Sequence, residues 1–317
     1  MSPQVPAGAA AAAAPPLLEV QNLRTWFDTE RGLFKAVDGI SFSVGRARSV
    51  GLVGESGCGK SVTSLSLMGL VPSPPGRVSA DRLVFEGRDV LGLPANERRL
   101  LRGGRMAMVL QEPMTSLNPV HRIGRQIVEA IQAHSDLSNE AARARAIEVL
   151  ELVRIPSPAQ WFDDFPHQLS GGMRQRVMIA MALSCEPSLL IADEPTTALD
   201  VTIQAHILDL LRDLQQRQGM AILIITHDLG VIAELVDEVI VMSAGQVVER
   251  ARLQALFDDP QHPYMIGLLG SDAHCHAEAP PLHRLGPEHL AACWKAPVEQ
   301  CLPAATALAS GRTVATT

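Results

Sequence analysis

The sequence contains no apolar run of the roughly 20 residues that a membrane-spanning helix needs. Its longer apolar segments, such as Met220 to Thr226, have the length of strands. It also has no basic excess, because 27 lysines and arginines stand against 34 aspartates and glutamates, for a net charge of -7. A broad nucleic-acid-binding face normally carries such an excess. These absences disfavour a membrane-spanning chain and a nucleic-acid-binding chain, so any membrane role would act through a partner.

The cysteines are few, and their spacing does not indicate a disulfide framework. The five cysteines are an odd number at irregular spacings, unlike the disulfide pattern of a secreted domain. We therefore expect a reducing, cytosolic compartment. The segment from Ala7 to Pro16 is rich in alanine and proline but lacks the cationic start and leucine-rich core of a signal peptide. We interpret residues 1–16 as a disordered leader, followed by a globular chain whose 47% hydrophobic residues suffice for a buried core.

Lysine is rarer still, because the chain has only Lys35, Lys60 and Lys295. One of them stands in the lysine position of a G-x-x-x-x-G-K-[ST] pattern, which predicts a P-loop. The pattern consists of Gly54, Glu55, Ser56, Gly57, Cys58, Gly59, Lys60 and Ser61. An apolar run precedes it and a helical pattern, Val62 to Leu70, follows it. A glycine turn that merely caps a helix is the alternative, but the strand before and the helix after favour the P-loop.

A P-loop binds phosphate mainly through its backbone. Gly54, Gly57 and Gly59 can adopt positive φ and turn successive N–H groups inward, which forms an anion-binding nest. The helix that follows adds the partial positive charge of its N-terminus. We expect Lys60 to reach the β- and γ-phosphates of ATP and the Ser61 hydroxyl to complete the Mg²⁺ shell.

The rest of the chain alternates strands with helical segments. The expected strands are Leu17 to Leu23, Lys35 to Val44, Arg82 to Phe85, Met106 to Leu110, Leu189 to Ala192 and Ala221 to Ile225. The expected helical segments are Asn96 to Arg102, Ile123 to Val153 with Ser138 as a cap, and Val201 to Arg217. This order predicts a parallel sheet with helices on its faces.

An aromatic pair, Trp26 and Phe27, lies between the first two expected strands. Core or edge positions are the ordinary interpretation of such a pair. Because a P-loop follows, stacking on an adenine ring is the second interpretation, and we favour Phe27 for that role.

Polar residues follow three further strands. Asp193 and Glu194 come directly after an apolar strand, where ligands collect in open parallel sheets. Helix capping is the alternative for such acids. Beside a P-loop, Asp193 would hold Mg²⁺, and Glu194 would polarise the water that attacks the γ-phosphate. His227 could bind the γ-phosphate and orient that water, and Gln111 could touch the metal and the water through its amide.

These motifs together resemble the ATP-binding subunit of an ABC transporter. Gly54 to Ser61 is similar to the Walker A motif, Gln111 to the Q-loop glutamine, and Leu189 to Asp193 with Glu194 to Walker B. The matches to the signature, D-loop and H-loop are Leu169-Ser170-Gly171-Gly172, Thr197-Ala198-Leu199-Asp200 and His227. The resemblance covers about Leu17 to Leu269. It implies a P-loop NTPase of the α/β class, with a parallel-sheet ATP-binding core, an antiparallel β subdomain and an inserted helical signature subdomain.

The signature implies a second subunit. Ser170, Gly171 and Gly172 expose N–H groups at a helix N-terminus, a second phosphate site that cannot reach the P-loop of the same chain. In the family, head-to-tail pairing places each ATP between one subunit's P-loop and the other subunit's signature. We expect the D-loop Asp200 to be among the nucleotide-binding residues. The resemblance therefore implies pairing with a copy of this chain or with a homologue.

Finer motifs are similar to the dipeptide, oligopeptide and nickel importer family. They are Met114-Thr115-Ser116-Leu117-Asn118-Pro119, Asp200-Val201-Thr202-Ile203-Gln204 and Pro260-Gln261-His262-Pro263-Tyr264. Many relatives carry a longer tail with four cysteines that hold an iron–sulfur cluster. Here Cys275 and Cys293 match only the last two, and Cys301 lies beyond them, so we expect no cluster held by this chain.

The resemblance implies an ATPase that powers import of peptides or a related small solute. Its implied partners are two membrane-spanning permease subunits, a second ABC ATPase and, indirectly, an extracytoplasmic solute-binding protein, with no nucleic acid. We expect a peripheral protein on the cytoplasmic face of the membrane. Residues 17–259 would form the ATP-binding domain, with a helical subdomain at about 112–184, and residues 260–317 a shortened extension. A nickel importer ATPase, or a soluble ABC ATPase acting on ribosomes or DNA, is the alternative.

Overall fold

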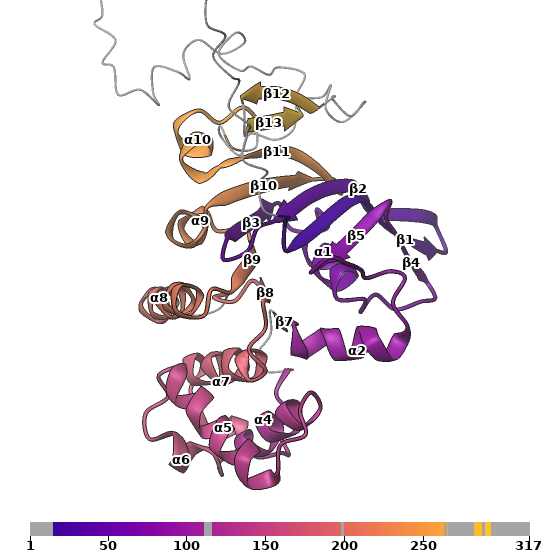
Figure 1. Ribbon diagram of the computed structural model, residues 1–317. Helices are drawn as coiled ribbons and strands as arrows, with labels where there is room; N and C mark the ends of the chain where they lie inside the picture. The colour runs from indigo at the N-terminus through magenta and orange to yellow at the C-terminus, as the bar shows by residue number, and fades with distance from the viewer. Residues whose placement is uncertain are drawn as a thin grey trace, which may run out of the picture.

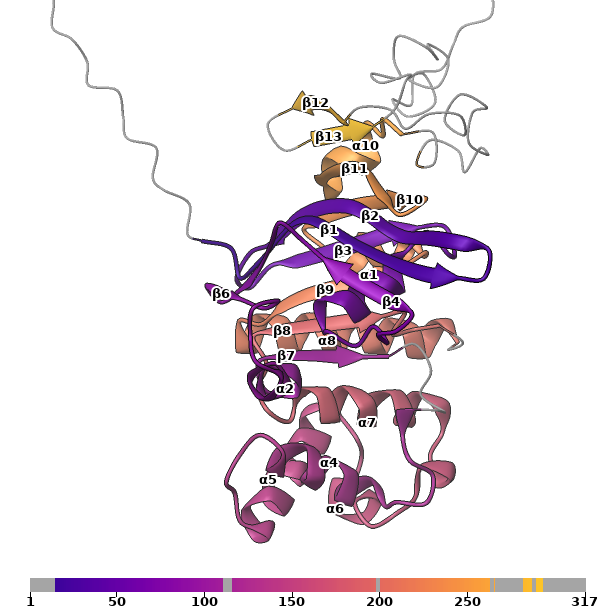
Figure 2. The same cartoon turned by 90° about the vertical axis from the view of Figure 1, so that its right-hand side faces the viewer.

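The computed structural model describes residues 15–110, 116–197, 200–262, 265, 282–286 and 289–292. Two sheets and a separate group of helices make up this part of the chain (Figure 1). The smaller sheet lies against one face of the larger, and the helices α4, α5, α6 and α7 gather beyond the β7 edge of the larger sheet (Figure 2). Among the described residues, no helix is long and apolar enough to cross a membrane.

The smaller sheet is antiparallel. It contains β1 (Leu18–Thr29), β2 (Gly32–Val44), β4 (Gly76–Ser79), β5 (Arg82–Phe85) and β6 (Arg88–Asp89), in the order β2-β1-β5-β6 with β4 paired to β1. The predicted alternation of Ile40, Phe42 and Val44 is confirmed, because all three are buried on one face. The antiparallel subdomain expected from the resemblance is therefore present.

The placement of Trp26 and Phe27 between strands was wrong. Both lie inside β1, where they pair with Lys35 and Phe34 of β2. The hairpin extends to the pair Thr29 and Gly32, with its end exposed to solvent. An exposed hairpin end needs no alternation of apolar and polar residues, so the pattern used to bound the strand stops before the strand does.

The larger sheet has a parallel centre, as predicted. Its order is β12-β13-β11-β10-β3-β9-β8-β7, with β10, β3, β9, β8 and β7 parallel and the remaining pairs antiparallel. The strands are β3 (Ser49–Gly54), β7 (Met106–Val109), β8 (Leu189–Asp193), β9 (Ala221–Thr226), β10 (Glu238–Ser243), β11 (Gln246–Arg252), β12 (Leu282–Gly286) and β13 (His289–Ala292).

Four helical segments were predicted with bounds, and α1, α2 and α8 lie within about three residues of theirs, whereas no bounds were predicted for α6, η1, α7, α9 and α10. They are α1 (Lys60–Leu67), α2 (Ala95–Gly104), α4 (Ile123–Gln132), α5 (Asn139–Leu152), α6 (Pro158–Trp161), the 3₁₀ helix η1 (Pro166–Gln168), α7 (Gly171–Leu183), α8 (Val201–Gln218), α9 (Leu229–Leu235) and α10 (Leu253–Asp258). The helical pattern after Ile123 divides into α4 and α5. Ser138 caps α5, as expected, by accepting a hydrogen bond from Ala141 N at 3.2 Å.

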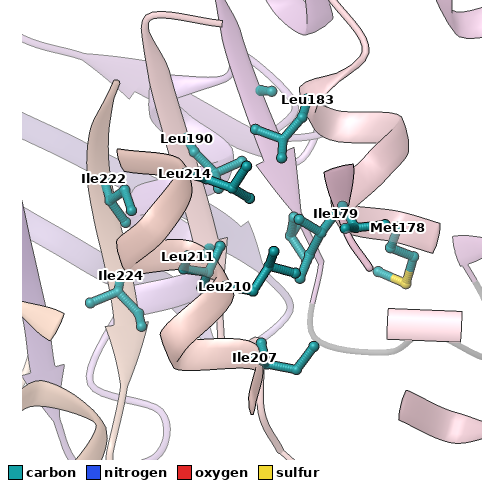
Figure 3. Close-up of a cluster of buried hydrophobic side chains, with 14 of the residues drawn as sticks. Met178, Ile179, Leu183, Leu190, Ile207, Leu210, Leu211, Leu214, Ile222 and Ile224 are labelled. Carbon is teal, nitrogen blue, oxygen red and sulfur yellow. The ribbon is translucent and has the colours of Figure 1, made fainter. Parts of the chain in front are cut away.

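The central strands are buried on both faces, which divides the apolar core in two. In β8, Leu190 and Ala192 belong to one cluster, and Leu189 and Ile191 belong to the other. The first cluster packs the sheet against α7 and α8 (Figure 3). The second packs it against α1 and the smaller sheet. Continuous apolar runs in the sequence follow from this double burial.

A buried carboxylate joins β11 to the chain that follows α10. Glu249 is 0% exposed, and its two oxygens accept hydrogen bonds from the backbone N–H groups of Gln261 at 3.0 Å and His262 at 2.9 Å. These donors open the Pro260 to Tyr264 motif, of which Pro263 and Tyr264 lie outside the described residues. Cys275, Cys293 and Cys301 also lie outside them.

Candidate active site

Three neighbouring strands deliver the predicted site residues to one edge of the larger sheet. The register pairs Val53 of β3 with Thr226 of β9, and Asp193 of β8 with Ile225 of β9. The residues that follow these strand ends, including Glu194 and His227, therefore lie together. Gln111 lies outside the described residues, although β7 is parallel to β8 and its last pair joins Val109 to Ala192.

The P-loop backbone has the conformation that its glycines predict. Gly54, Gly57 and Gly59 have φ of 156°, 82° and 104°. A Cβ on Gly54 would lie 2.2 Å from Met242 O, and one on Gly59 would lie 2.3 Å from Ala36 O. Neither position can accept a side chain without moving backbone of a neighbouring strand, so both glycines are required by space as well as by φ.

Lys60 points into the loop rather than into solvent. It is 5% exposed, and its Nζ donates to the carbonyl oxygens of Gly54 at 2.7 Å and Glu55 at 2.8 Å. Gly59 is the N-cap of α1, so the helix N-terminus and the ammonium group lie side by side. A lysine ammonium beside a helix N-terminus is an arrangement of the kind that binds a chain of phosphates.

Ser61 and Asp193 form a cluster of oxygen atoms beside the loop. Ser61 Oγ donates to Asp193 Oδ1 at 3.2 Å, and Ser64 Oγ donates to Asp193 Oδ2 at 3.4 Å. Asp193 is 4% exposed, and burial raises its pKa, partly offset by the hydrogen bond from Ser61. The Ser61 hydroxyl and the Asp193 carboxylate lie next to each other, and both are oxygen ligands of the type that Mg²⁺ prefers. These residues therefore fit a magnesium site.

Glu194 is held by two neighbours in a left-handed conformation, with φ 46°. Its Oε2 accepts a hydrogen bond from Thr197 Oγ1 at 2.8 Å, and its Oε1 lies 3.0 Å from His227 Nδ1. Burial tends to raise the pKa of Glu194, but the hydrogen bonds from Thr197 and His227 outweigh it, so the pKa lies below its ordinary value. The carboxylate is therefore ionised at neutral pH.

The signature residues lie apart from this cluster. Ser170 is exposed and caps α7, accepting a hydrogen bond from Met173 N at 3.3 Å. Gly171 is exposed as well, whereas Gly172 is buried. Within the described part of the chain, no hydrogen bond or ion pair joins Ser170, Gly171 or Gly172 to residues 54–61. The structure thus gathers the P-loop, Asp193, Glu194 and His227, but not the signature.

The chain is similar to known ABC transporter proteins over the region that contains these motifs. The family model described as "ABC transporter" matches residues 37–197, and a model of an AAA domain matches residues 165–233. The dipeptide transport ATP-binding protein DppD of Escherichia coli (strain K12) is 55% identical over 253 residues, which cover 80% of this chain and 77% of that protein. The chain belongs to the ABC transporter family. It is an ATP-binding subunit with the ABC ATPase fold.

Other proteins that are similar to this ABC ATPase are also ABC transporter components. The oligopeptide transport ATP-binding protein OppD of Bacillus subtilis (strain 168) is 50% identical, over 87% of this chain and 75% of that protein. Among solved structures, a dimeric bacterial ABC transporter cassette, MJ0796, matches with a TM-score of 0.64 and 26% identity, over 74% of this chain and 98% of that chain. A post-hydrolysis dimer of the same cassette, bound to ADP and Pi, has a TM-score of 0.67 at 24% identity.

Two glutamines of the ABC ATPase that sequence reasoning missed join its site elements. Gln175 Nε2, on α7, donates to the carbonyl oxygen of Pro195 at 2.6 Å. Gln204 Nε2, on α8, donates to Asp228 Oδ2 at 3.1 Å, and Asp228 caps α9 directly after His227. A signal for Gln175 existed, because it occupies a helical position in line with buried Gly172 and Ile179. A polar residue on a buried stripe predicts a buried hydrogen bond.

Asp200 and Phe27 have local structural contacts. Asp200 is the N-cap of α8 and accepts a hydrogen bond from Ile203 N at 2.9 Å. Phe27 is half-buried in β1, and its ring lies near Gly76, where an added Cβ would be 3.0 Å from Phe27 Cε1. Two residues earlier, Thr25 Oγ1 lies 2.6 Å from Ser66 Oγ of α1, so β1 passes close to the P-loop helix.

Proposed function

We propose that this ABC ATPase powers the import of peptides through membrane-spanning permease subunits. The observation that carries the proposal is that the P-loop, Asp193, Glu194 and His227 meet at one sheet edge in a chain with high identity to peptide transport subunits. DppD of Escherichia coli and OppD of Bacillus subtilis are named for dipeptide and oligopeptide transport. The ATPase from Sinorhizobium fredii with 52% identity is named as a probable peptide ABC transporter subunit.

Each site residue has a role that its position supports. The P-loop residues Gly54 to Ser61 cradle the phosphates, with Lys60 as the cation among them. Ser61 and Asp193 hold Mg²⁺, with Gln111 as a further ligand. When bound, Mg²⁺ supplies charge neutralisation at the transferring phosphoryl group.

The attacking water is assigned to Glu194. Its ionised carboxylate accepts a proton from the water, while His227, 3.0 Å away, orients that carboxylate and contacts the γ-phosphate. Phe27 of β1 stacks on the adenine ring, which places the nucleotide along the P-loop helix.

The signature completes the site of a second subunit. Ser170, Gly171 and Gly172 lie at the N-terminus of α7 without contact to their own P-loop, so they bind the ATP of a partner in a head-to-tail dimer. Asp200 lies next to that interface. ATP binding closes the dimer, and phosphate release removes the ligand that favours closure.

The remaining assignments concern the assembly. A helical subdomain at about 112–184, inserted in an ATP-binding domain of residues 17–259, passes the closing motion to two permease subunits on the cytoplasmic face of the membrane. An extracytoplasmic binding protein supplies the peptide, and residues 260–317 form a family-specific extension. No nucleic acid takes part, consistent with the net charge of -7.

The first experiment is copurification. The chain is tagged, its native membranes are solubilised in mild detergent, and associated proteins are identified by mass spectrometry. Two multi-spanning proteins and a related or identical ATPase are expected. The recovered complex, reconstituted with its binding protein in vesicles, should show ATP hydrolysis stimulated by di- and oligopeptides. In the Glu194→Gln complex this hydrolysis should be about 100-fold or more slower.

Two results would contradict the proposal. Recovery only in a soluble fraction with ribosomal proteins or nucleic acid would exclude the transport role. Stimulation by Ni²⁺ but not by peptides would keep the importer and replace the substrate class.

A further inference from the structure

The turn after β8 carries Glu194 in a conformation that its own sequence does not favour. A φ of 46° is disfavoured for a residue with a Cβ, so surrounding contacts must hold it. Within the turn, Thr197 N donates to Glu194 O at 3.2 Å, and Glu194 N donates to Ile225 O of β9 at 2.7 Å. These bonds hold the peptide units on both sides of Glu194.

The next peptide unit is fixed from another element. Pro195 is buried directly after Glu194, and its carbonyl oxygen accepts the 2.6 Å hydrogen bond from Gln175 Nε2. Gln175 is itself 1% exposed, so neither water nor a rotated side chain can readily replace the bond. The ring of Pro195 fixes its φ, so a buried amide that donates to the Pro195 carbonyl oxygen also restrains the peptide unit that joins Glu194 to Pro195.

Gln175 belongs to the helix that begins at the signature. Ser170 is the N-cap of α7, and Gln175 lies in its second turn. Gly172, between them, packs against α8, because an added Cβ would lie 2.7 Å from Ile203 Cγ2. The signature end of α7 thus packs against α8, while Gln175 of the same helix contacts the turn that carries Glu194.

We propose that Gln175 is a positioning residue that couples the signature of this subunit to its own Glu194. The inference rests on the proposed roles of Ser170 and Glu194. In a head-to-tail dimer, Ser170 contacts the partner's ATP, whereas Glu194 acts on the ATP of its own P-loop. Gln175 thus links the two ATP sites through one subunit and aligns the base when the opposite site closes.

The test uses Gln175→Met in the full chain with its copurified partners. Methionine keeps the length and burial of the side chain but cannot donate to Pro195 O. We expect kcat for ATP hydrolysis to fall about 10- to 100-fold, as for a misplaced catalytic group. The affinity for a fluorescent ATP analogue should stay within about twofold, since the P-loop is untouched. The Hill coefficient for ATP should fall toward one.

A control variant tests whether the same substitution has the same effect at a position remote from the site. Gln215 Nε2 on α8 donates to the carbonyl oxygen of Ala47 at 3.4 Å in an exposed bond, remote from the sheet edge of the site. Gln215→Met should leave kcat and the Hill coefficient unchanged, and lost packing at Gln175 is followed by thermal unfolding. Thermal unfolding of both variants is measured alongside, so that kcat is compared well below each Tm.

A double variant tests whether Gln175 acts through Glu194. If it does, the Glu194→Gln variant and the Glu194→Gln/Gln175→Met double variant will have the same residual single-turnover rate. Once the base has been removed, its position can no longer affect the rate. A further fall in the double variant would mean an independent effect and would overturn the proposal. So would a kcat of Gln175→Met within about twofold of the wild type.

Gln175→Glu provides a conservative rescue. A buried carboxyl group donates to Pro195 O only when it is protonated, so its activity should recover as the pH falls, unlike that of Gln175→Met. Ionisation of a buried carboxyl group also lowers stability, so Tm is measured over the same pH range and activities are compared only well below Tm. A wild-type complex without any ATPase activity would refute the catalytic roles themselves, and peptide-independent hydrolysis would refute only the peptide assignment.

Discussion

At the scale of single residues, adjacent carboxylates at the end of β8 have opposite environments. Burial is the main influence on Asp193 and raises its pKa. Burial also acts on Glu194, but hydrogen bonds from Thr197 and His227 outweigh it and lower its pKa. A nearby cation would therefore stabilise the ionised form of Asp193, whereas Glu194 stays ionised without a cation.

Asp193→Asn is expected to stabilise the metal-free protein at neutral pH. A carboxyl group with a raised pKa in the folded state reduces stability as the pH rises from its unfolded pKa through the folded value. Asparagine has no such penalty, so Tm should rise at pH 7, and the difference should shrink toward pH 4. Differential scanning calorimetry at both pH values measures this.

The control for that measurement is Asp209→Asn, which changes an exposed carboxylate paired with Arg212 on α8. It should alter Tm little. ATPase activity of Asp193→Asn should fall about 100-fold through loss of metal binding. A lower Tm at pH 7 for Asp193→Asn would show that its hydrogen bonds with Ser61 and Ser64 outweigh the burial penalty.

Lys60→Ala and Glu194→Gln should separate binding from turnover. Lys60→Ala removes the ammonium inside the P-loop, so nucleotide affinity and hydrolysis should both be lost. Glu194→Gln leaves the loop intact, so the affinity should be kept while kcat falls about 100-fold or more. Lys35→Ala, which removes a surface ion pair with Asp38, is the control for charge. Normal hydrolysis by Glu194→Gln would disprove the assigned base.

At the scale of elements, the sequence predicts strands that have a buried face and motifs whose residues stand at fixed spacings. β5, β8 and β9 lie within a residue of their predicted bounds, because an apolar run has to end where the strand leaves the core. The left-handed φ of Glu194 and the Gln175–Pro195 bond could not be predicted, since they depend on how α7 packs on the turn after β8. Roles that depend on nucleotide, such as that of Phe27, stay predictions.

The contact between α7 and α8 yields a packing prediction. Gly172→Ala would place a Cβ 2.7 Å from Ile203 Cγ2, too close for the helices to keep their spacing. Overpacking of this kind costs about 1–3 kcal/mol of unfolding free energy. Ile203→Ala in the same chain should restore much of that loss. Urea denaturation of the two single variants and the double variant measures the coupling, and additive losses would mean that the helices do not meet at these residues.

At the scale of the whole molecule, the site is incomplete within one chain. The P-loop, Asp193 and Glu194 share one sheet edge, while Ser170 stands at the end of a helix without contact to them. We propose that a second subunit completes the site, and the similar cassette MJ0796 is described as dimeric.

Dimerisation should therefore depend on both ATP and the signature. Glu194→Gln with ATP and Mg²⁺ should form a species of about twice the 34.0 kDa chain mass by light scattering, with itself or with the copurified ATPase. Ser170→Arg in the same background should remain monomeric. Equal dimer formation by the Ser170→Arg variant would remove the signature from the interface.

The buried Glu249 carboxylate also bears on how the molecule could be divided. Its strand, β11, lies two places from the P-loop strand in the sheet, and its oxygens receive the N–H groups of Gln261 and His262. A chain cut after Asp259 would lose both of these hydrogen bonds, each worth about 0.5–1.5 kcal/mol. Gln261 and His262 are thus structural components of the ATPase. We expect a chain truncated before them to aggregate during expression.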